Sequence, residues 1–340
     1  MKKLSLIYLK ISLFVLISYL NTPAQSTSLV NWMSFEEAVK KQEEAPKIIL
    51  INMYTDWCGW CKRMDENTYG NPAIASYINT HFYPVKFNAE RKDTIEYKGN
   101  TYINDGQGRR PSHQLAQALM GGRMSFPTTV YIDDDFRAYP VPGYMEPDRI
   151  ESLLVYFAEK INKNCDFTDF DVDYKNTFNT DFSENIDGVV NWIDFDDIAE
   201  KMKHEPKKMI LFLNSDYANG SKMMINSVFK HPVVSRYLNE EFYSAKINYD
   251  TKDTLEILDN VFINEGEQLG YPHQLTITLL QPDIRLPAMI FFDSGSNLIF
   301  ALRGYYPPKI IERYLSFISL KLYKSESWED FNEKFISEIE

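Results

Sequence analysis

The chain has 340 residues, of which 44% are hydrophobic and 14% aromatic. At roughly 100 to 200 residues per domain, this length predicts two domains, and the composition is sufficient to fill two cores. The formal net charge of −12 argues against a nucleic-acid-binding protein, because contacts to phosphate need clustered Lys and Arg.

Residues 1–24 are predicted to be a signal peptide. Lysines near the start precede the apolar stretch 11–20, and the small residues Thr22 and Ala24 offer a cleavage point before Gln25. An apolar stretch of about ten residues is short for a membrane span, which needs about 20, so cleavage is favoured over an uncleaved anchor. The mature chain is therefore expected to be exported to the periplasm, with no stable membrane span after signal cleavage.

The next part of the sequence alternates between predicted helices and strands. Ser34 and Glu37 form a capping box that begins a helix reaching about Glu44, and the apolar run Ile48–Met53 predicts a buried strand. In chain order, the remaining predictions are a helix over 61–69, a short helix after Pro72, a strand over 82–87, a hairpin over 94–103, a helix over 112–120, strands over 128–132 and 137–141, and a helix over 147–160. This order predicts an α/β fold with a mixed central sheet and helices on both faces.

Cys58 and Cys61 lie at the junction between the strand Ile48–Met53 and the helix that follows it. Two thiols separated by two residues can close a disulfide if the first begins the helix and the second lies one turn inside it. Free backbone N–H groups and the positive end of the helix dipole favour a thiolate at this place, so Cys58 is predicted to be the nucleophile. Cys61 is expected to be more buried and to react second. Structural disulfides of an exported protein would be scattered pairs, so this close pair favours catalysis.

The mature sequence contains a tandem repeat. A shift of 160 positions places Trp32 on Trp192 and Pro127 on Pro287 in one register. The repeat predicts two tandem domains with the same order of elements. The predicted divisions are a signal peptide over 1–24, a domain with the cysteine pair over 25–161, a linker over 162–187, a degenerate domain without cysteines over 188–321 and a C-terminal tail, which could be helical, over 322–340.

The linker and the tail carry aromatic residues at matching positions, since Phe167–Phe170 lies at a shift of 161 from Trp328–Phe331. Two interpretations follow. Both segments are tails that pack their aromatic side chains back on the preceding repeat, or they are a loose linker and a solvated amphipathic helix over 327–336. Cys165, in the linker, is either an unpaired thiol or a site of intermolecular pairing.

The sequence Trp57-Cys58-Gly59-Trp60-Cys61-Lys62 after a buried strand, with Phe126-Pro127-Thr128 further along, resembles the active site and cis-proline loop of the thioredoxin superfamily. More narrowly, it resembles exported bacterial thioredoxin-like proteins related to the C-terminal domain of the thiol:disulfide interchange reductase. The resemblance covers the first domain directly and the second only through the repeat. It implies thioredoxin-like domains and thiol:disulfide oxidoreductase activity on proteins, with no cofactor and no metal.

The resemblance also implies a role for each site residue. Cys58 would attack a substrate disulfide, and Cys61 would resolve the mixed disulfide. Pro127 would follow a cis bond and place the backbone of Phe126 beside Cys58, where it can pair with a bound peptide. The supporting residues would be Trp57 and Trp60 at an apolar rim, Gly59 between the cysteines, and Lys86 under the site.

Two departures from this pattern affect the expected chemistry. Thioredoxins have a buried aspartate at the position of Asn52, and a neutral amide cannot act as a general base. Proton transfer must therefore use water, Glu90 or another group. The segment between the second strand and Pro127 is longer than in a minimal thioredoxin and contains Arg109 and Arg110, which favours a specialised partner.

The second repeat lacks the thiols. Ala218 and Ser221 stand at the positions of Cys58 and Cys61, so this repeat cannot perform dithiol chemistry. Trp32, Lys86 and Pro127 recur there, and His113 recurs as His273, so a structural role is favoured for the histidine. The residues that do not recur are better candidates for active-site or partner-specific roles: Trp57, Trp60, Arg63, Arg109 and Arg110.

The function predicted from these features is an exported protein-disulfide oxidoreductase, with the reductase direction favoured by the thioredoxin-like Gly59 and Lys62. Its partners would be proteins with disulfides or thiols and an electron-exchange partner, and the second domain would be non-catalytic and could bind partners. The alternative is a scaffold or binding protein in which the disulfide is structural. A zinc site is disfavoured, because two thiolates leave a tetrahedral site half empty.

Overall fold

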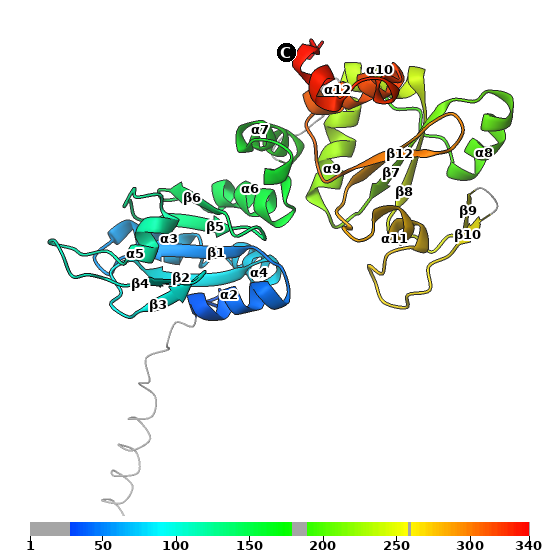
Figure 1. Cartoon of the computed structure of the whole chain (residues 1–340). Coiled ribbons are helices and arrows are strands. Elements are labelled where there is room, and N and C mark those ends of the chain that lie inside the picture. Colours follow the sequence, from blue (N-terminus) through cyan, green and yellow to red (C-terminus); the bar gives the residue numbers. More distant parts are fainter. Residues whose placement is uncertain (1–27, 179–188, 258–259, 340) are drawn as a thin grey trace, which may run out of the picture. The chain divides into compact units, whose positions relative to one another are not determined.

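The computed structural model describes residues 28–178, 189–257 and 260–339 (Figure 1). The chain divides into two compact units, unit 1 over residues 1–147 and unit 2 over residues 148–340. The predicted signal peptide and the part of the predicted linker from residue 179 on lie outside the described residues. The predicted domain boundaries place the stretch 148–161 in the first domain, whereas the compact units place it in the second, and those boundaries stay predictions.

Unit 1 is built on a four-stranded sheet in the order β2-β1-β5-β6. β1 runs parallel to β2, whereas β5 runs antiparallel to β1 and to β6. The strands are β1 (Ile49–Tyr54), β2 (Tyr83–Asn88), β5 (Thr128–Ile132) and β6 (Ala138–Pro142), with a separate hairpin of β3 (Ile95–Tyr97) and β4 (Asn100–Tyr102). The helices are α2 (Phe35–Glu44), α3 (Gly59–Asn67), α4 (Pro72–His81) and α5 (Gln114–Leu119).

Side chains of β1 alternate between the two faces of this sheet, as they must in an extended strand. Ile49, Ile51 and Met53 pack in one hydrophobic core with residues of α2 and α5. Asn52 points to the opposite face, where its amide contacts Asp65 of α3. The strand therefore carries an apolar core on one face and a polar group directed at the helix of the cysteine pair on the other.

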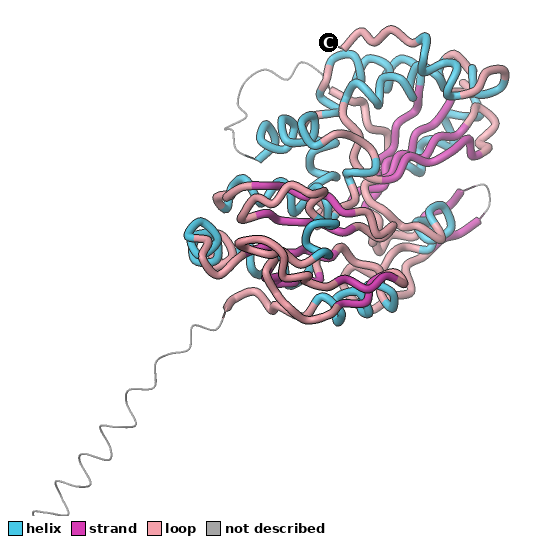
Figure 2. The backbone as a smooth tube through the Cα atoms, turned by 60° about the vertical axis from the view of Figure 1, so that its left-hand side comes forward, coloured by secondary structure: helices cyan, strands magenta, loops and turns pink. Residues whose placement is uncertain are grey.

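Unit 2 contains a second sheet in the order β12-β11-β7-β8 (Figures 1 and 2). Its strands have the same relative directions as those of the first sheet. Its strands are β7 (Lys208–Asn214), β8 (Phe242–Asn248), β11 (Ala288–Phe292) and β12 (Leu298–Arg303), with a hairpin of β9 (Leu255–Ile257) and β10 (Asn260–Phe262). The helices around it are α8 (Phe195–His204), α9 (Asn219–Asn226), α10 (Pro232–Glu241), α11 (Gln274–Leu280) and α12 (Pro308–Ser319). The predicted fold class, two mixed α/β sheets flanked by helices, is confirmed.

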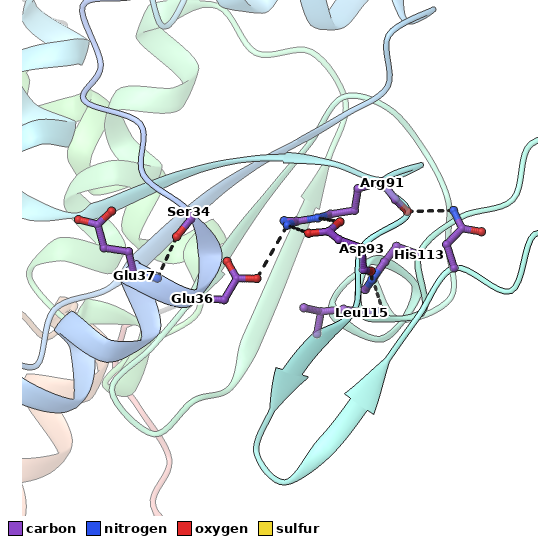
Figure 3. Close-up of polar contacts among 8 residues, drawn as sticks. Ser34, Glu36, Glu37, Arg91, Asp93, His113 and Leu115 are labelled. Atoms are coloured by element: carbon purple, nitrogen blue, oxygen red, sulfur yellow. Dashed lines mark hydrogen bonds and ion pairs between the residues drawn. The ribbon is translucent and has the colours of Figure 1, made fainter.

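Two helix starts show how the sequence fixes local structure. Ser34 accepts a hydrogen bond from the backbone N–H of Glu37 at 3.1 Å, which confirms the predicted start of α2 (Figure 3). α5 begins at Gln114, later than predicted, because His113 is its N-cap and accepts from the backbone N–H of Leu115 at 3.2 Å. The other ring nitrogen of His113 lies 3.0 Å from the carbonyl oxygen of Asp93.

His273 caps α11 in the same way, with distances of 3.1 Å to the N–H of Leu275 and to the carbonyl oxygen of Asp253. Both imidazoles are buried. In each ring, one nitrogen contacts a helix N–H and the other contacts a backbone carbonyl. This geometry agrees with the predicted structural role of His113.

The predicted linker and tail contain packed helices. These are α7 (Phe167–Phe178), which follows α6 (Pro147–Ala158), and α13 (Trp328–Lys334). Phe170 is buried, with its ring 5.3 Å from that of Tyr156 and 5.9 Å from that of Tyr305. Trp328 stacks on Tyr314 at a centroid distance of 4.0 Å. The loose-linker interpretation is therefore wrong for residues 167–178, because their aromatic side chains are packed. None of the helices described is long and apolar enough to cross a bilayer.

Candidate functional site

The two cysteines form a disulfide at the beginning of α3, with their Cα atoms 5.3 Å apart. Cys58 is the N-cap of this helix, and its sulfur accepts the backbone N–H of Cys61 at 3.1 Å. The exposed fraction is 5% for Cys58 and 1% for Cys61, in the predicted order. A Cβ atom added at Gly59 would meet nothing within 4 Å, so space does not require a glycine between the cysteines.

The predicted proline loop lies beside this motif. The Phe126–Pro127 peptide bond is cis, as expected, and Pro127 is buried. The ring of Phe126 lies 6.1 Å from that of Trp57 in an edge-to-face arrangement. The structure thus brings together the cysteine motif and a loop that lies far from it in sequence.

Both tryptophans of the motif lie at the surface, with exposed fractions of 49% for Trp57 and 57% for Trp60. The indole N–H of Trp57 donates to Glu90 at 2.9 Å, and the guanidinium of Arg110 lies 3.9 Å from the ring centroid. Glu90, which the sequence offered as a possible proton acceptor, is therefore engaged by Trp57.

Trp60 is held on the other side of the motif. Its ring lies 5.4 Å from that of Tyr144, and the Arg63 guanidinium lies 5.4 Å from the centroid of Trp60 and 5.8 Å from that of Tyr144. Each tryptophan thus has one arginine on its ring. The sequence predicted the aromatic rim, but it did not predict that the arginines would contact the tryptophan rings.

Beneath the motif, three polar side chains form a connected group. The buried amide of Asn52 donates to one carboxylate oxygen of Asp65 at 2.9 Å, and the ammonium of Lys86 lies 2.8 Å from the other. Asn52 and Lys86 face each other across the parallel pair β1 and β2. The predicted position of Lys86 under the site thus involves an ion pair with Asp65.

Sequence reasoning missed Asp65 and Tyr144. The signal for Asp65 was its position four residues after Cys61, which places both side chains on one face of the helix. Tyr144 had no comparable local signal, since it lies in a turn after β6 and contacts the motif only through folding.

The corresponding place in unit 2 is arranged differently. Ala218 is the N-cap of α9 and makes no side-chain cap, whereas the carboxylate of Glu159 accepts the backbone N–H groups of Asn219 and Gly220, both at 2.8 Å. A Cβ atom at Gly220 would lie 3.0 Å from Pro287, which follows a cis bond, and 3.1 Å from Glu159. An acidic side chain therefore fills the helix end that carries the disulfide in unit 1.

Among the described residues, one group of three carboxylates is close enough to hold a metal ion, namely Asp133, Asp134 and Asp135. Asp133 already accepts the backbone N–H groups of Asp135 and Arg137 and the hydroxyl of Tyr139. Through these hydrogen bonds Asp133 stabilises the turn between β5 and β6, which explains why an acidic residue lies there.

Comparison with known proteins shows which proteins part of the chain resembles. Residues 17–164 match the family model named Thioredox_DsbH and described as "Protein of unknown function, DUF255". An uncharacterized protein of Archaeoglobus fulgidus is 34% identical over 71 residues, which are 21% of this chain and 56% of that protein. The thiol:disulfide interchange protein DsbD of Photorhabdus laumondii is 21% identical over 132 residues, which are 38% of this chain and 19% of that protein.

The solved structure of a DsbH oxidoreductase shares 19% identity with this chain, with a TM-score of 0.29 and coverage of 42% of this chain and 92% of its own. The chain thus spans about half the length of the first curated relative and about a fifth of the second. The family match includes both cysteines and the cis-proline loop. Residues 17–164, less than half of the chain, are therefore similar to the DsbH/DUF255 family.

Proposed function

We propose that the protein is an exported thiol:disulfide oxidoreductase that reduces protein disulfides through Cys58 and Cys61. The observation that carries this proposal is a disulfide at the N-terminus of a helix, beside a cis-proline loop and between two exposed tryptophans. The name of the DsbD relative, a thiol:disulfide interchange protein, supports the same reaction type. Unit 2 has no cysteine at the corresponding helix end and does not take part in the chemistry.

The first step uses Cys58. In the reduced protein its thiolate lies at the N-cap, where free backbone N–H groups and the helix dipole stabilise negative charge. The thiolate attacks one sulfur of the substrate disulfide, a mixed disulfide forms, and the other substrate sulfur leaves as a thiolate. A substrate that approaches Cys58 would meet the exposed rings of the two tryptophans beside it.

The second step uses Cys61. Its thiol loses a proton and attacks the Cys58 sulfur of the mixed disulfide, which restores the Cys58–Cys61 bond and releases the second substrate thiolate. Two electrons pass from the dithiol to the substrate, and a reduced donor must regenerate the dithiol. The hydrogen bond from the Cys61 N–H to the Cys58 sulfur keeps the two sulfur-bearing residues in register for this exchange.

The test is the reduction of a protein disulfide with dithiothreitol as electron donor. The rate is measured from the increase in turbidity or from the release of free thiols. Wild type is expected to accelerate the reaction, and Cys58→Ser is expected to abolish the acceleration. Cys165→Ser is the matched control, because it also removes one thiol but lies in unit 2. Equal rates for wild type and Cys58→Ser would exclude the catalytic role.

The reductase direction is tested by equilibrium with glutathione buffers. A reduction potential in the thioredoxin range, about −270 mV, is expected for a reductase. A value near the strongly oxidising end, about −120 mV, would instead make the protein an oxidant.

The scaffold alternative predicts partner capture that does not depend on thiols. The oxidoreductase proposal instead predicts that Cys61→Ser protein retains substrates covalently through Cys58 and that a reductant releases them.

Export is tested by cell fractionation and by the mass of the mature chain, which should begin at Gln25.

A further inference from the structure

We propose that Arg63 and Arg110 select substrates whose disulfide lies in an acidic segment, by binding carboxylates on the two sides of the reacting cysteine. This inference rests on the proposed function and names the class of its substrate. Both arginines are exposed, and they come from different parts of the chain, α3 and the loop 104–111.

The two guanidinium groups are positioned by aromatic rings. Arg110 lies 3.9 Å from the ring centroid of Trp57, and Arg63 lies over both Trp60 and Tyr144. A guanidinium that contacts a ring through its face keeps the N–H groups at its edge for a carboxylate, which it can bind with two parallel hydrogen bonds. Within the described residues, neither arginine has an ion-pair partner. The side chains are therefore held in place while their donors remain available.

The charge around the disulfide is opposite to that of the chain, whose net charge is −12. The motif and the loops beside it, residues 56–63, 89–93, 104–111 and 121–127, contain seven cations, which are Lys62, Arg63, Arg91, Lys92, Arg109, Arg110 and Arg123. The four anions of the same segments are Asp56, Glu90, Asp93 and Asp105, of which Glu90 already accepts the indole N–H of Trp57 and Asp93 is paired with Arg91. Asp65 is paired with Lys86. An acidic peptide would thus meet a locally positive surface.

Unit 2 provides an internal comparison. At the shift of 160, the corresponding segments contain three cations, Lys222, Lys252 and Arg285, and six anions, Asp216, Asp250, Asp253, Glu265, Glu267 and Asp283. Met223 and Gly270 replace the two ring-bound arginines. The positive surface is therefore present only in the repeat that has thiols, as expected for a role in the reaction and not in the fold.

The experiment uses reduced full-length Cys61→Ser protein and two synthetic peptides. Each peptide carries one cysteine as its 2-pyridyl disulfide, flanked on both sides either by Glu or by Lys. The Cys58 thiolate attacks the peptide sulfur, the mixed disulfide forms, and pyridine-2-thione leaves, so its absorbance gives the second-order rate constant.

The Cys61→Ser protein with both arginines present should react about tenfold faster with the Glu peptide than with the Lys peptide at low ionic strength, and added salt should reduce this ratio. Arg63→Gln with Arg110→Gln should remove most of this preference by slowing the Glu peptide alone. A change in the reactivity of Cys58 itself would alter the rates of both peptides. Arg137→Gln, at an exposed arginine in the turn between β5 and β6, makes the same kind of charge change and should keep the preference.

Equal rates for the two peptides with an active protein, or an unchanged preference in the double variant, would overturn the inference while leaving the oxidoreductase intact. If neither peptide reacts although iodoacetamide labels Cys58, the proposed function itself fails. The two failures are therefore distinguishable.

Discussion

The side-chain amide of Asn52, on β1, donates a hydrogen bond at 2.9 Å to the carboxylate of Asp65, on the helix α3 that begins at the cysteine pair. Asp65 lies one helical turn after Cys61, and Lys86 binds its second oxygen. Asn52 stands where thioredoxins have a buried aspartate. Here its amide orients a different carboxylate, that of Asp65 on α3. Asp65 follows Cys61 by four residues and shares its helix face, so its carboxylate is the candidate proton acceptor for this buried thiol, which is 1% exposed.

Asp65→Asn is therefore expected to slow the resolution of a mixed disulfide at pH 7 by about 100-fold, the lower end of the range for general-base catalysis. The rate should recover at higher pH, where hydroxide can remove the proton of Cys61. Stopped-flow measurement on the preformed mixed disulfide follows this step. Alkylation of Cys58 in reduced protein is the control for the first step, and an unchanged resolution rate would contradict the assignment.

Glu159 stabilises unit 2 by capping α9. Its carboxylate accepts two backbone N–H groups at 2.8 Å and the side-chain amide of Asn219 at 3.2 Å. Glu159→Ala leaves these donors without an acceptor and should cost about 1 to 3 kcal/mol in the free energy of unfolding. Urea denaturation monitored by fluorescence measures this difference. Full stability in the alanine variant would show that water replaces the carboxylate without loss.

The same residue gives a pH dependence. Burial raises the pKa of Glu159, and the hydrogen bonds from Gly220 and Asn219 oppose this shift only in part. A carboxyl whose pKa is higher in the folded state contributes stability that is present below its unfolded pKa and is lost as pH rises through the folded pKa. Relative to Glu159→Gln, wild type should therefore lose stability as the pH rises from about 4, the ordinary range of a glutamate, through the raised pKa of the folded state. The opposite slope would contradict the raised pKa.

His113 and His273 form a matched pair for a stability measurement. Each caps a helix through a backbone N–H, so His113→Ala and His273→Ala should each destabilise their own unit by about 1 to 2 kcal/mol. Hydrogen exchange assigns the loss to α5 or to α11. At a temperature where both variants are folded, His113→Ala should retain disulfide reduction; loss of activity without loss of folding would reveal a catalytic role.

Cys165 is expected to be unreactive. Burial, together with the neighbouring Asp169, Asp173 and Asp166, raises the pKa of its thiol to about 12, so it is protonated at neutral pH. In the Cys58→Ser, Cys61→Ser double variant, iodoacetamide at pH 8 should therefore label the single thiol slowly, and faster after addition of urea. A disulfide-linked dimer on non-reducing electrophoresis that disappears in Cys165→Ser would contradict this prediction.

The sequence alone determined the local elements and the position of the cysteine motif. Ser34 with Glu37, the apolar run that became β1 and the cysteine pair that begins α3 are short-range signals, since caps, alternation and helix position depend on neighbouring residues. The two-unit α/β architecture followed from the repeat and the order of elements. Pro127 was identified through the resemblance, and its cis bond agrees with it.

Only the tertiary structure decided which distant groups surround the cysteines. Asp65 meets Asn52 and Lys86, Arg110 reaches Trp57, and Glu159 fills the helix end of unit 2, because each contact joins segments whose separation is set by sheet pairing and helix packing. Charged side chains of this kind are common on protein surfaces, and neither their spacing nor their neighbours in the sequence reveal such contacts. The sequence therefore identified the thiols that we propose to react, whereas folding decided which charges lie beside them.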